Sequence, residues 1–166
     1  QQTLDLDHQK LEAFQAVDEL LTQQKSWDDL ERSYRKMIGR VKDTDNEKLL
    51  FMLYKNLGEI YRSRLDRPEH AASSFELAVK INPGDVKVHE ILAQLYENSG
   101  DLDKAVATHR ILAQNDPERV SAYKAMMNYY QQMGRRDEAW VTSSILVLLR
   151  KASGEEAGFY KEHRAP

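Results

Sequence analysis

Histidine and carboxylate side chains are the groups in this chain best suited to acid–base chemistry or metal binding. The five histidines are His8, His70, His89, His109 and His163. No two of them show the H-E-x-x-H spacing, or another spacing that places two metal ligands on one helix face. The 27 aspartate and glutamate residues lie in no apolar pattern that would raise a carboxyl pKa, a common mark of catalysis. We therefore expect no catalytic residue, no metal site and no cofactor, and we interpret the histidines as surface or packing residues.

The absence of cysteine excludes disulfides, thiolate metal sites and cysteine nucleophiles. The net charge of -3 argues against a nucleic-acid-binding protein that depends on a strong positive field. The longest apolar run, 145–149, is far shorter than a membrane span, and no signal peptide is visible. We expect a cytoplasmic protein. Because the first residue is Gln rather than Met, we also expect a fragment or a processed product.

A basic segment is the strongest charge cluster in the chain. Its members are Arg32, Arg35, Lys36, Arg40 and Lys42. Three of them, at i, i+4 and i+8, share one face of a predicted helix at 27–42. That face suits RNA, phosphate or an acidic protein as a partner. Acidic residues flank the segment, and so we favour a solvated helix exterior and keep the RNA-binding or acidic-partner function as an alternative.

One stretch, residues 54–83, carries a pattern that recurs along the chain. The pattern is aromatic-x2-Leu-Gly-x2-Tyr, then small, large and small residues at i, i+4 and i+7, then a proline: Tyr54, Leu57, Gly58, Tyr61, Ala71, Phe75, Ala78 and Pro83. The first small residue recurs at Ala105 and Ala139, 34 residues apart each time. A fixed period of this length indicates a repeat architecture in which each unit stacks on the next.

The helical spacing and the low content of turn residues predict an all-α fold of antiparallel helix pairs. We predict a single domain, 1–166, with repeats at approximately 11–44, 51–85, 86–119 and 120–152 and a capping helix at 153–163. The apolar run at 145–149, with Phe159 and Tyr160, is interpreted as an internally capped end. A dimer interface and a contact with a further repeat remain alternatives. Trp27 and Trp140 are interpreted as packing residues near turns, with an exposed partner anchor as the alternative.

Several short motifs predict where helices begin and end. We expect Asp5 or Asp7 to cap the first helix, and Ser26 to cap the second. Capping boxes are expected at Thr44–Glu47, for a helix over about 45–63, and at Ser153–Glu156. Pro68, with Asp66 before it, and Pro117, with Asp116 before it, are expected to begin helices, and Asp85 is expected to cap one. Gly100 is expected to end a helix in the left-handed conformation.

Residues 11–151 resemble the tetratricopeptide-repeat family in the pattern given above, most closely in the two middle repeats. The resemblance implies a right-handed superhelical solenoid whose first helices build a concave groove, and a protein or peptide partner bound in that groove. Two positions depart from the family pattern. Asp18 replaces the glycine of the first repeat, and His109 replaces the phenylalanine of the third, where we expect looser packing or a polar groove.

The family's groove positions map onto the first helix of each repeat. In the last three repeats they are Met52, Lys55, Glu59, Arg62, Lys87, Glu90, Gln94, Glu97, Ser121, Lys124, Asn128 and Gln131. In the divergent first repeat they are Glu12, Gln15 and Glu19. This polar surface of mixed charge suits hydrogen bonds to a peptide backbone. The family's two-carboxylate clamp is rejected, because no full repeat follows Lys124 and Asn128 and three groove glutamates would repel an acidic peptide.

The leading function hypothesis is a non-catalytic protein–protein interaction scaffold. A divergent enzyme on a helical-repeat frame is the weakest alternative. The segment from Ala139 onward also loosely resembles one that follows such repeats in very large bacterial multi-repeat proteins. That similarity implies a piece of a longer scaffold or complex.

Overall fold

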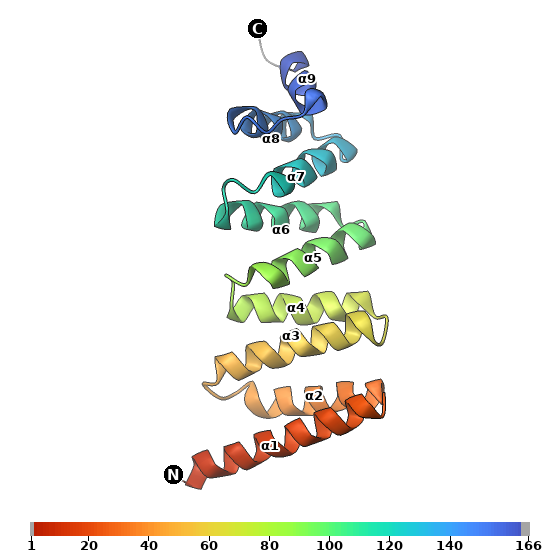
Figure 1. Cartoon of the computed structure of the whole chain (residues 1–166), viewed down its shortest axis with the longest axis vertical. Coiled ribbons are helices and arrows are strands. Elements are labelled where there is room, and N and C mark those ends of the chain that lie inside the picture. The colour runs from red at the N-terminus through yellow and green to blue at the C-terminus, as the bar shows by residue number, and fades with distance from the viewer. Residues whose placement is uncertain (1, 164–166) are drawn as a thin grey trace. The chain divides into compact units, whose positions relative to one another are not determined.

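The computed structural model describes the backbone of residues 2–163 and the side chains of residues 11–163, and the described backbone is all-α. Its nine helices are α1 (Gln2–Gln23), α2 (Trp27–Val41), α3 (Glu47–Ser63), α4 (Pro68–Ile81), α5 (Val86–Ser99), α6 (Leu102–Asn115), α7 (Val120–Gln132), α8 (Arg136–Leu148) and α9 (Gly154–Glu162). Figure 1 shows them joined by short turns. The all-α prediction is confirmed, and the packing of sequence neighbours is that of a helical-repeat solenoid.

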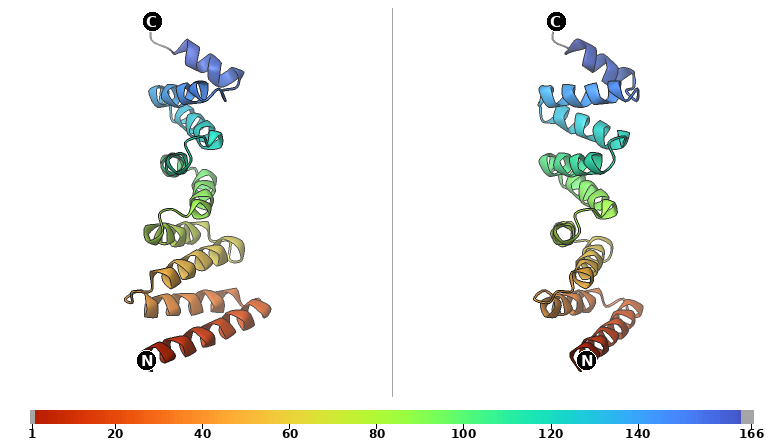
Figure 2. Two further views of the ribbon diagram at one scale, coloured as in Figure 1. Left: turned by 60° about the vertical axis from the view of Figure 1, so that its left-hand side comes forward. Right: turned by 90° about the vertical axis from the view of Figure 1, so that its left-hand side faces the viewer.

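The chain forms two compact units, Gln1–Pro83 and Gly84–Pro166, which are called unit 1 and unit 2. In unit 1, α2 packs against α1 and α3, and α3 packs against α4. In unit 2, each helix from α5 to α9 packs against the next one in sequence. Within each unit the successive helices lie side by side in chain order in all three ribbon views (Figures 1 and 2).

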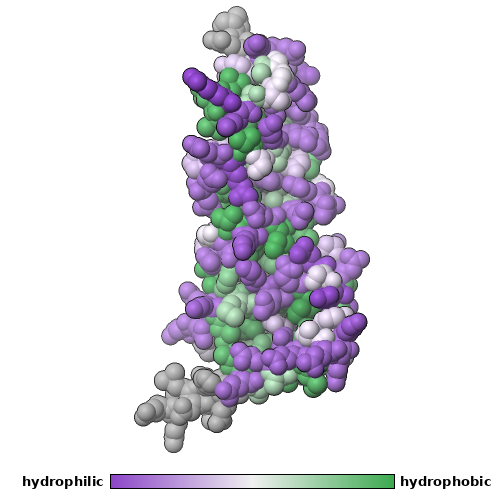
Figure 3. Space-filling model, viewed as in Figure 1, coloured by the Kyte–Doolittle hydropathy of each residue, from purple (hydrophilic) through white to green (hydrophobic). Residues whose placement is uncertain are grey.

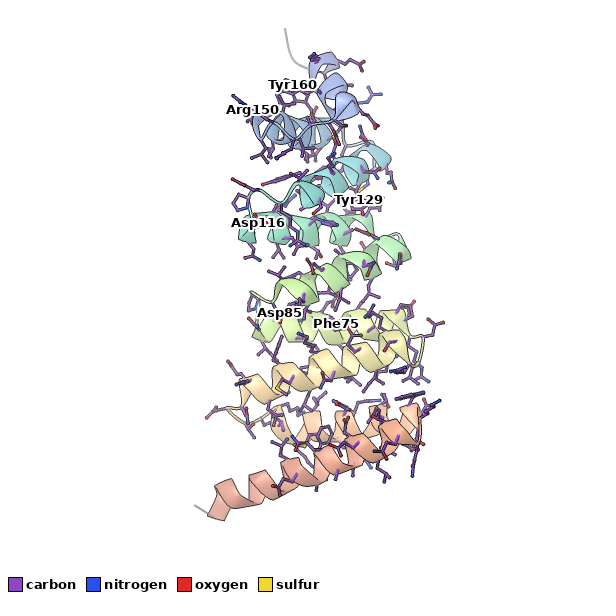
Figure 4. The ribbon with its side chains drawn as sticks, viewed as in Figure 1. Phe75, Asp85, Asp116, Tyr129, Arg150 and Tyr160 are labelled. Atoms are coloured by element: carbon purple, nitrogen blue, oxygen red, sulfur yellow. The ribbon has the colours of Figure 1, made fainter. Side chains whose placement is uncertain are left out.

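Small residues allow the two helices of a pair to approach closely. Ala71, Ala105 and Ala139 are each 0% exposed, as expected for the position that recurs every 34 residues. In unit 1, the fully buried ring of Phe75 on α4 (labelled in Figure 4) lies directly against Gly58 on α3. A methyl group added at Gly58 would lie 2.8 Å from two ring carbons of Phe75.

Four of the predicted helix ends are confirmed. The Asp85 carboxylate accepts a hydrogen bond from the Val88 backbone N–H at 2.9 Å and caps α5. Pro68 is the first residue of α4. Gly100 ends α5 with φ 75°, a left-handed conformation that costs glycine little. At α9, Ser153 and Glu156 form the predicted capping box.

The caps predicted for α1 and, at Asp66, for α4 are wrong, and the cap predicted for α2 is right in position only. The helix α1 begins at Gln2, so Asp5 and Asp7 lie inside it. Ser26 holds the N-cap position of α2, but its side chain makes no capping bond. Asp66 has φ 51° and lies in the turn, and Arg67 holds the N-cap position of α4.

Two further caps were placed too early in the sequence. Asn46, not Thr44, caps α3 and accepts from the Leu49 N–H at 3.1 Å. The Thr44 hydroxyl donates instead to the Val41 carbonyl at 2.7 Å and so serves the end of α2. The pair Asp116–Pro117 lies in the turn, because α7 begins only at Val120.

Gly39 is a glycine inside α2 that packing does not require. No atom lies within 4 Å of a Cβ built there, and its φ is not in the left-handed range. Helical glycine costs roughly 0.5–1 kcal/mol relative to alanine. Gly39→Ala should therefore raise the free energy of unfolding by about 0.5–1 kcal/mol, measured by urea denaturation. A loss of stability would show that the space beside Gly39 is needed.

Candidate partner-binding site

A cavity of about 250 Å³ opens in unit 1 between α1 and α3, which are the first helices of the first two repeats. The start of α2 forms its remaining wall. Most of its lining is polar: Asp18, Thr22, Tyr34, Asn56, Glu59, Ser63 and Arg64, with Trp27, Leu30 and Ile60 as the apolar part. The cavity therefore offers several hydrogen-bonding groups to a ligand.

The Tyr34 hydroxyl connects two polar groups of the cavity. Asn56 Nδ2 donates to Tyr34 Oη at 3.4 Å, and the hydroxyl also forms a hydrogen bond with Asp18. Burial of the phenol and the Asp18 carboxylate together raise the pKa of Tyr34 well above its ordinary value. The phenol thus stays neutral and donates to Asp18. This explains the first repeat's departure from the pattern, because the carboxylate in place of glycine is matched by a tyrosine in place of phenylalanine.

One arginine, Arg64, lines the cavity, and a second, Arg62, lies near it and pairs with a lining residue. The Arg64 guanidinium lies 4.8 Å from the centre of the Trp27 ring, in a cation–π contact. Arg62, which does not line the cavity, pairs with Glu59 at 2.9 Å. Trp27 is half-buried in this arrangement and packs near a turn, as predicted.

The twelve predicted groove residues of the last three repeats all lie on first helices, four each on α3, α5 and α7. None is buried: Lys55, Glu59 and Glu97 are half-buried and the others are exposed. The exposed fraction of Met52 is 49%. Only Glu59 lines the cavity. The α3 residues belong to unit 1 and the α5 and α7 residues to unit 2.

Several predicted groove residues already have partners within their own unit. Glu90 pairs with Arg119, and Lys124 pairs with Glu156 at 3.2 Å. Glu59 pairs with Arg62 as described above, and His109 Nε2 forms a hydrogen bond with the Glu97 carboxylate at 2.9 Å. The groove glutamates therefore repel an acidic ligand less than their sequence positions suggest. The pairing of Lys124 with Glu156 is a separate reason against a carboxylate clamp.

Comparison with known proteins identifies the architecture. Residues 53–85 match the family model of the tetratricopeptide repeat. The chain therefore carries a tetratricopeptide repeat at these residues and is similar in fold to tetratricopeptide-repeat proteins. A tetratricopeptide repeat protein of Parabacteroides merdae is similar in structure, with a TM-score of 0.62 and 20% identity over 92% of this chain. This chain spans only 58% of the length of that protein.

Two further solved structures share the fold. The MamA protein has a TM-score of 0.57 and 16% identity, covering 90% of this chain and 84% of its own. YrrB has a TM-score of 0.56 and 18% identity, covering 96% of this chain and 78% of its own. YrrB is described as a tetratricopeptide-repeat protein with an unusual peptide-binding site.

A polar cluster in unit 2 replaces an aromatic packing residue of the repeat. His109 on α6 and Tyr129 on α7 both bond to Glu97 on α5. Burial and the hydrogen bond to Glu97 raise the pKa of Tyr129, so its hydroxyl remains a donor. His109 Nδ1 is buried and has no partner among the described residues. The polar surroundings expected at His109 are thus present, and the hydrogen bonds of the cluster hold the Glu97 side chain.

The helix α9 covers the last tetratricopeptide repeat. Phe159 packs against the apolar core of unit 2, and the Trp140 and Tyr160 rings stack with centroids 5.7 Å apart. Trp140 Nε1 also donates to the Tyr160 carbonyl at 3.1 Å (Figure 4). This packing agrees with internal capping, which stays a prediction. Part of α8 remains uncovered, since Leu148 is 80% exposed.

Glu156 links α9 to α7 and makes the cap sensitive to pH. Burial opposes its ionisation, but hydrogen bonds from Ser153 and the Lys124 ammonium outweigh this and lower the pKa of Glu156 below 4.5. The unfolded chain therefore binds the proton more readily. The stabilisation is complete above pH 4.5 and is lost as the pH falls through the lower folded-state pKa.

The expected result is that Glu156→Gln destabilises unit 2 at neutral pH and that the difference from the parent shrinks on acidification. The measurement is urea unfolding followed by Trp140 fluorescence in a Trp27→Phe background. Glu155→Gln removes an exposed neighbouring charge and serves as the matched control. A parent-to-variant difference that is constant from neutral to acid pH would contradict the prediction.

Two of the five residues of the basic segment pair with acidic neighbours on α2. Arg32 pairs with Asp29 at 2.7 Å, and Arg35 lies 3.5 Å from Glu31. Glu31 is itself buried and accepts from the Tyr61 hydroxyl at 2.5 Å.

Figure 3 shows hydrophilic and hydrophobic residues intermixed over the visible faces of unit 1 and of unit 2. Among the described residues, no helix is both long and apolar enough to cross a membrane.

Proposed function

We propose that this chain is a protein-interaction module, with no chemistry of its own, that binds a segment of a partner protein along the first helices of its repeats. The observation that carries this proposal is the polar cavity between α1 and α3. The tetratricopeptide-repeat fold and the peptide-binding site named for YrrB support it.

The chemistry of these surfaces suits an extended peptide. In unit 1, the Asn56 amide and the Thr22 and Ser63 hydroxyls line the cavity and can pair with backbone N–H and C=O groups. In unit 2, Gln94 and Asn128 present exposed amides of the same kind. Because such groups hydrogen-bond with any sequence, they supply affinity, and pockets for side chains supply specificity.

The test uses a displayed library of short random peptides, selected on the parent chain. The groove variant carries Lys55→Ala, Lys87→Ala, Gln94→Ala and Asn128→Ala. The control variant removes the same four residue types from positions off the first helices: Lys151→Ala, Lys161→Ala, Gln114→Ala and Asn115→Ala. All four control positions are exposed.

We expect the selected peptides to bind the groove variant about tenfold or more weakly, equivalent to about 1.4 kcal/mol. The control variant should bind as the parent does. Circular dichroism should show both variants to be folded. Equal binding to the groove variant and the parent would contradict a contribution of these four residues and would confine the site to the cavity or move it off the first helices.

A further inference from the structure

The cavity between α1 and α3 contains a carboxylate that lacks a cationic partner. Asp18 is half-buried and bonds to the neutral Tyr34 hydroxyl. It forms no ion pair with any residue whose side chain the structure describes. A carboxylate removed from water is stabilised most by a cation that also donates hydrogen bonds to it. One hydroxyl satisfies only part of that requirement.

Asp18 is the lining carboxylate whose charge is not balanced by an ion pair. The lining also holds Glu59, which pairs with Arg62 at 2.9 Å, and one cation, Arg64. Between residues 11 and 24, α1 and the turn after it carry acidic residues and no lysine or arginine. Glu19, next to Asp18, is exposed. The long side of the cavity formed by α1 is therefore negative.

The aromatic part of the cavity suits a planar cation. Trp27 is in the lining and already holds the Arg64 guanidinium 4.8 Å from its ring centre. A guanidinium stacks on aromatic rings and donates to carboxylates with two N–H groups at once, whereas an ammonium is a compact, strongly hydrated charge. The polar atoms of Asn56 and Ser63 add further acceptors in the same lining.

We propose that this cavity is a specificity pocket that takes an arginine side chain of the bound partner segment. The guanidinium pairs with the Asp18 carboxylate, and Glu59 and the Trp27 ring supply secondary contacts. The inference rests on the proposed function, because it assigns one side chain of the peptide that the module binds. Arg64 competes for the Trp27 face, so binding of the partner arginine displaces it or stacks beside it.

Asp18→Asn is the variant that isolates the charge. Asparagine has the same shape, and its side-chain oxygen can still accept from the Tyr34 hydroxyl. Glu19→Gln is the matched control, because it removes the same charge from the adjacent residue of α1, which is exposed and outside the cavity lining. Glu59→Gln is a second test variant, in which the loss should be smaller because Glu59 already pairs with Arg62.

The probe is the displayed random-peptide library, selected separately on the parent, Asp18→Asn and Glu19→Gln chains. We expect arginine to be enriched at one peptide position on the parent and on Glu19→Gln, and not on Asp18→Asn. An arginine-containing peptide should lose about tenfold in affinity when its arginine is changed to glutamine, on the scale of one charge-assisted contact. That loss should vanish on Asp18→Asn.

Each of the other outcomes of this selection contradicts the arginine pocket. Enrichment of lysine, or of no cation, would exclude an arginine pocket while leaving peptide binding by the first helices intact. Equal arginine enrichment on Asp18→Asn would place the arginine elsewhere on the surface. If no peptide is selected on the parent, the arginine pocket and the proposed function both fail.

Discussion

Replacing Phe75 with alanine should lower the free energy of unfolding of unit 1 by about 3–5 kcal/mol. The Phe75 ring is fully buried on α4 and lies against Gly58 of α3. Removing it loses the transfer free energy of the ring and leaves a cavity beside Gly58, between the two helices. Since each helix of a repeat protein packs mainly on its neighbours, little other structure can close that space.

The measurement is urea denaturation followed by fluorescence. The chain has two tryptophans, Trp27 in unit 1 and Trp140 in unit 2, so a Trp140→Phe background reports on unit 1 alone. Leu77→Ala is the matched control, because Leu77 lies on the same helix but is 39% exposed. A loss for Phe75→Ala no larger than that for Leu77→Ala would show that the ring is not the main contact of the pair.

The sequence predicted the repeat architecture well because the pattern reflects a physical requirement at helix crossings. A small residue is needed where two backbones approach, and Ala71, Ala105 and Ala139 meet this need with complete burial. The period of 34 residues follows from repeating the same crossing. The α helices and their pairing in sequence could therefore be predicted without coordinates.

Helix starts were less predictable because several nearby residues can satisfy the same free N–H groups. Thr44 and Asn46 are both good capping residues. Asn46 holds the N-cap position, while the Thr44 hydroxyl donates to the Val41 carbonyl and accepts from the Asn46 N–H. At the start of α7, the Asp116 carboxylate accepts from the Glu118 N–H in the turn, which delays the helix to Val120. A choice of this kind depends on the preceding helix end and not on the motif alone.

The cavity was not predicted from the sequence, because its lining residues come from three helices whose positions the family pattern treats separately. Sequence inspection singled out Asp18 as a missing glycine, and Tyr34 followed the ordinary spacing of the second helix. Their hydrogen bond, and the approach of Asn56 from α3, appear only when three helices are packed together. The first repeat departs from the family pattern at two contacting positions, with Asp18 in place of glycine and Tyr34 in place of phenylalanine. This paired departure was the signal in the sequence that could have predicted the cavity.

Enlarging Gly58, the small residue that lies against Phe75, should also change the free energy of unfolding strongly. In the Gly58→Ala variant, the added Cβ would lie 2.8–2.9 Å from three carbons of the Phe75 ring, closer than real Cβ contacts. The ring is fully buried among other core residues. The expected loss in the free energy of unfolding is about 1–3 kcal/mol from overpacking, even though alanine favours the helix over glycine by about 1 kcal/mol.

Two comparisons separate the steric cost from the helix propensity. Gly39→Ala makes the same substitution in α2, where no atom lies within 4 Å of the new Cβ, and should stabilise the chain. In a Phe75→Leu background the ring atoms that Gly58→Ala would meet are gone, so the same substitution should cost less or become stabilising. The coupling between positions 58 and 75 is read from this double-mutant cycle by urea denaturation. Additive effects at the two positions would contradict the direct contact, because a cost that persists without the ring must arise from another neighbour of Gly58.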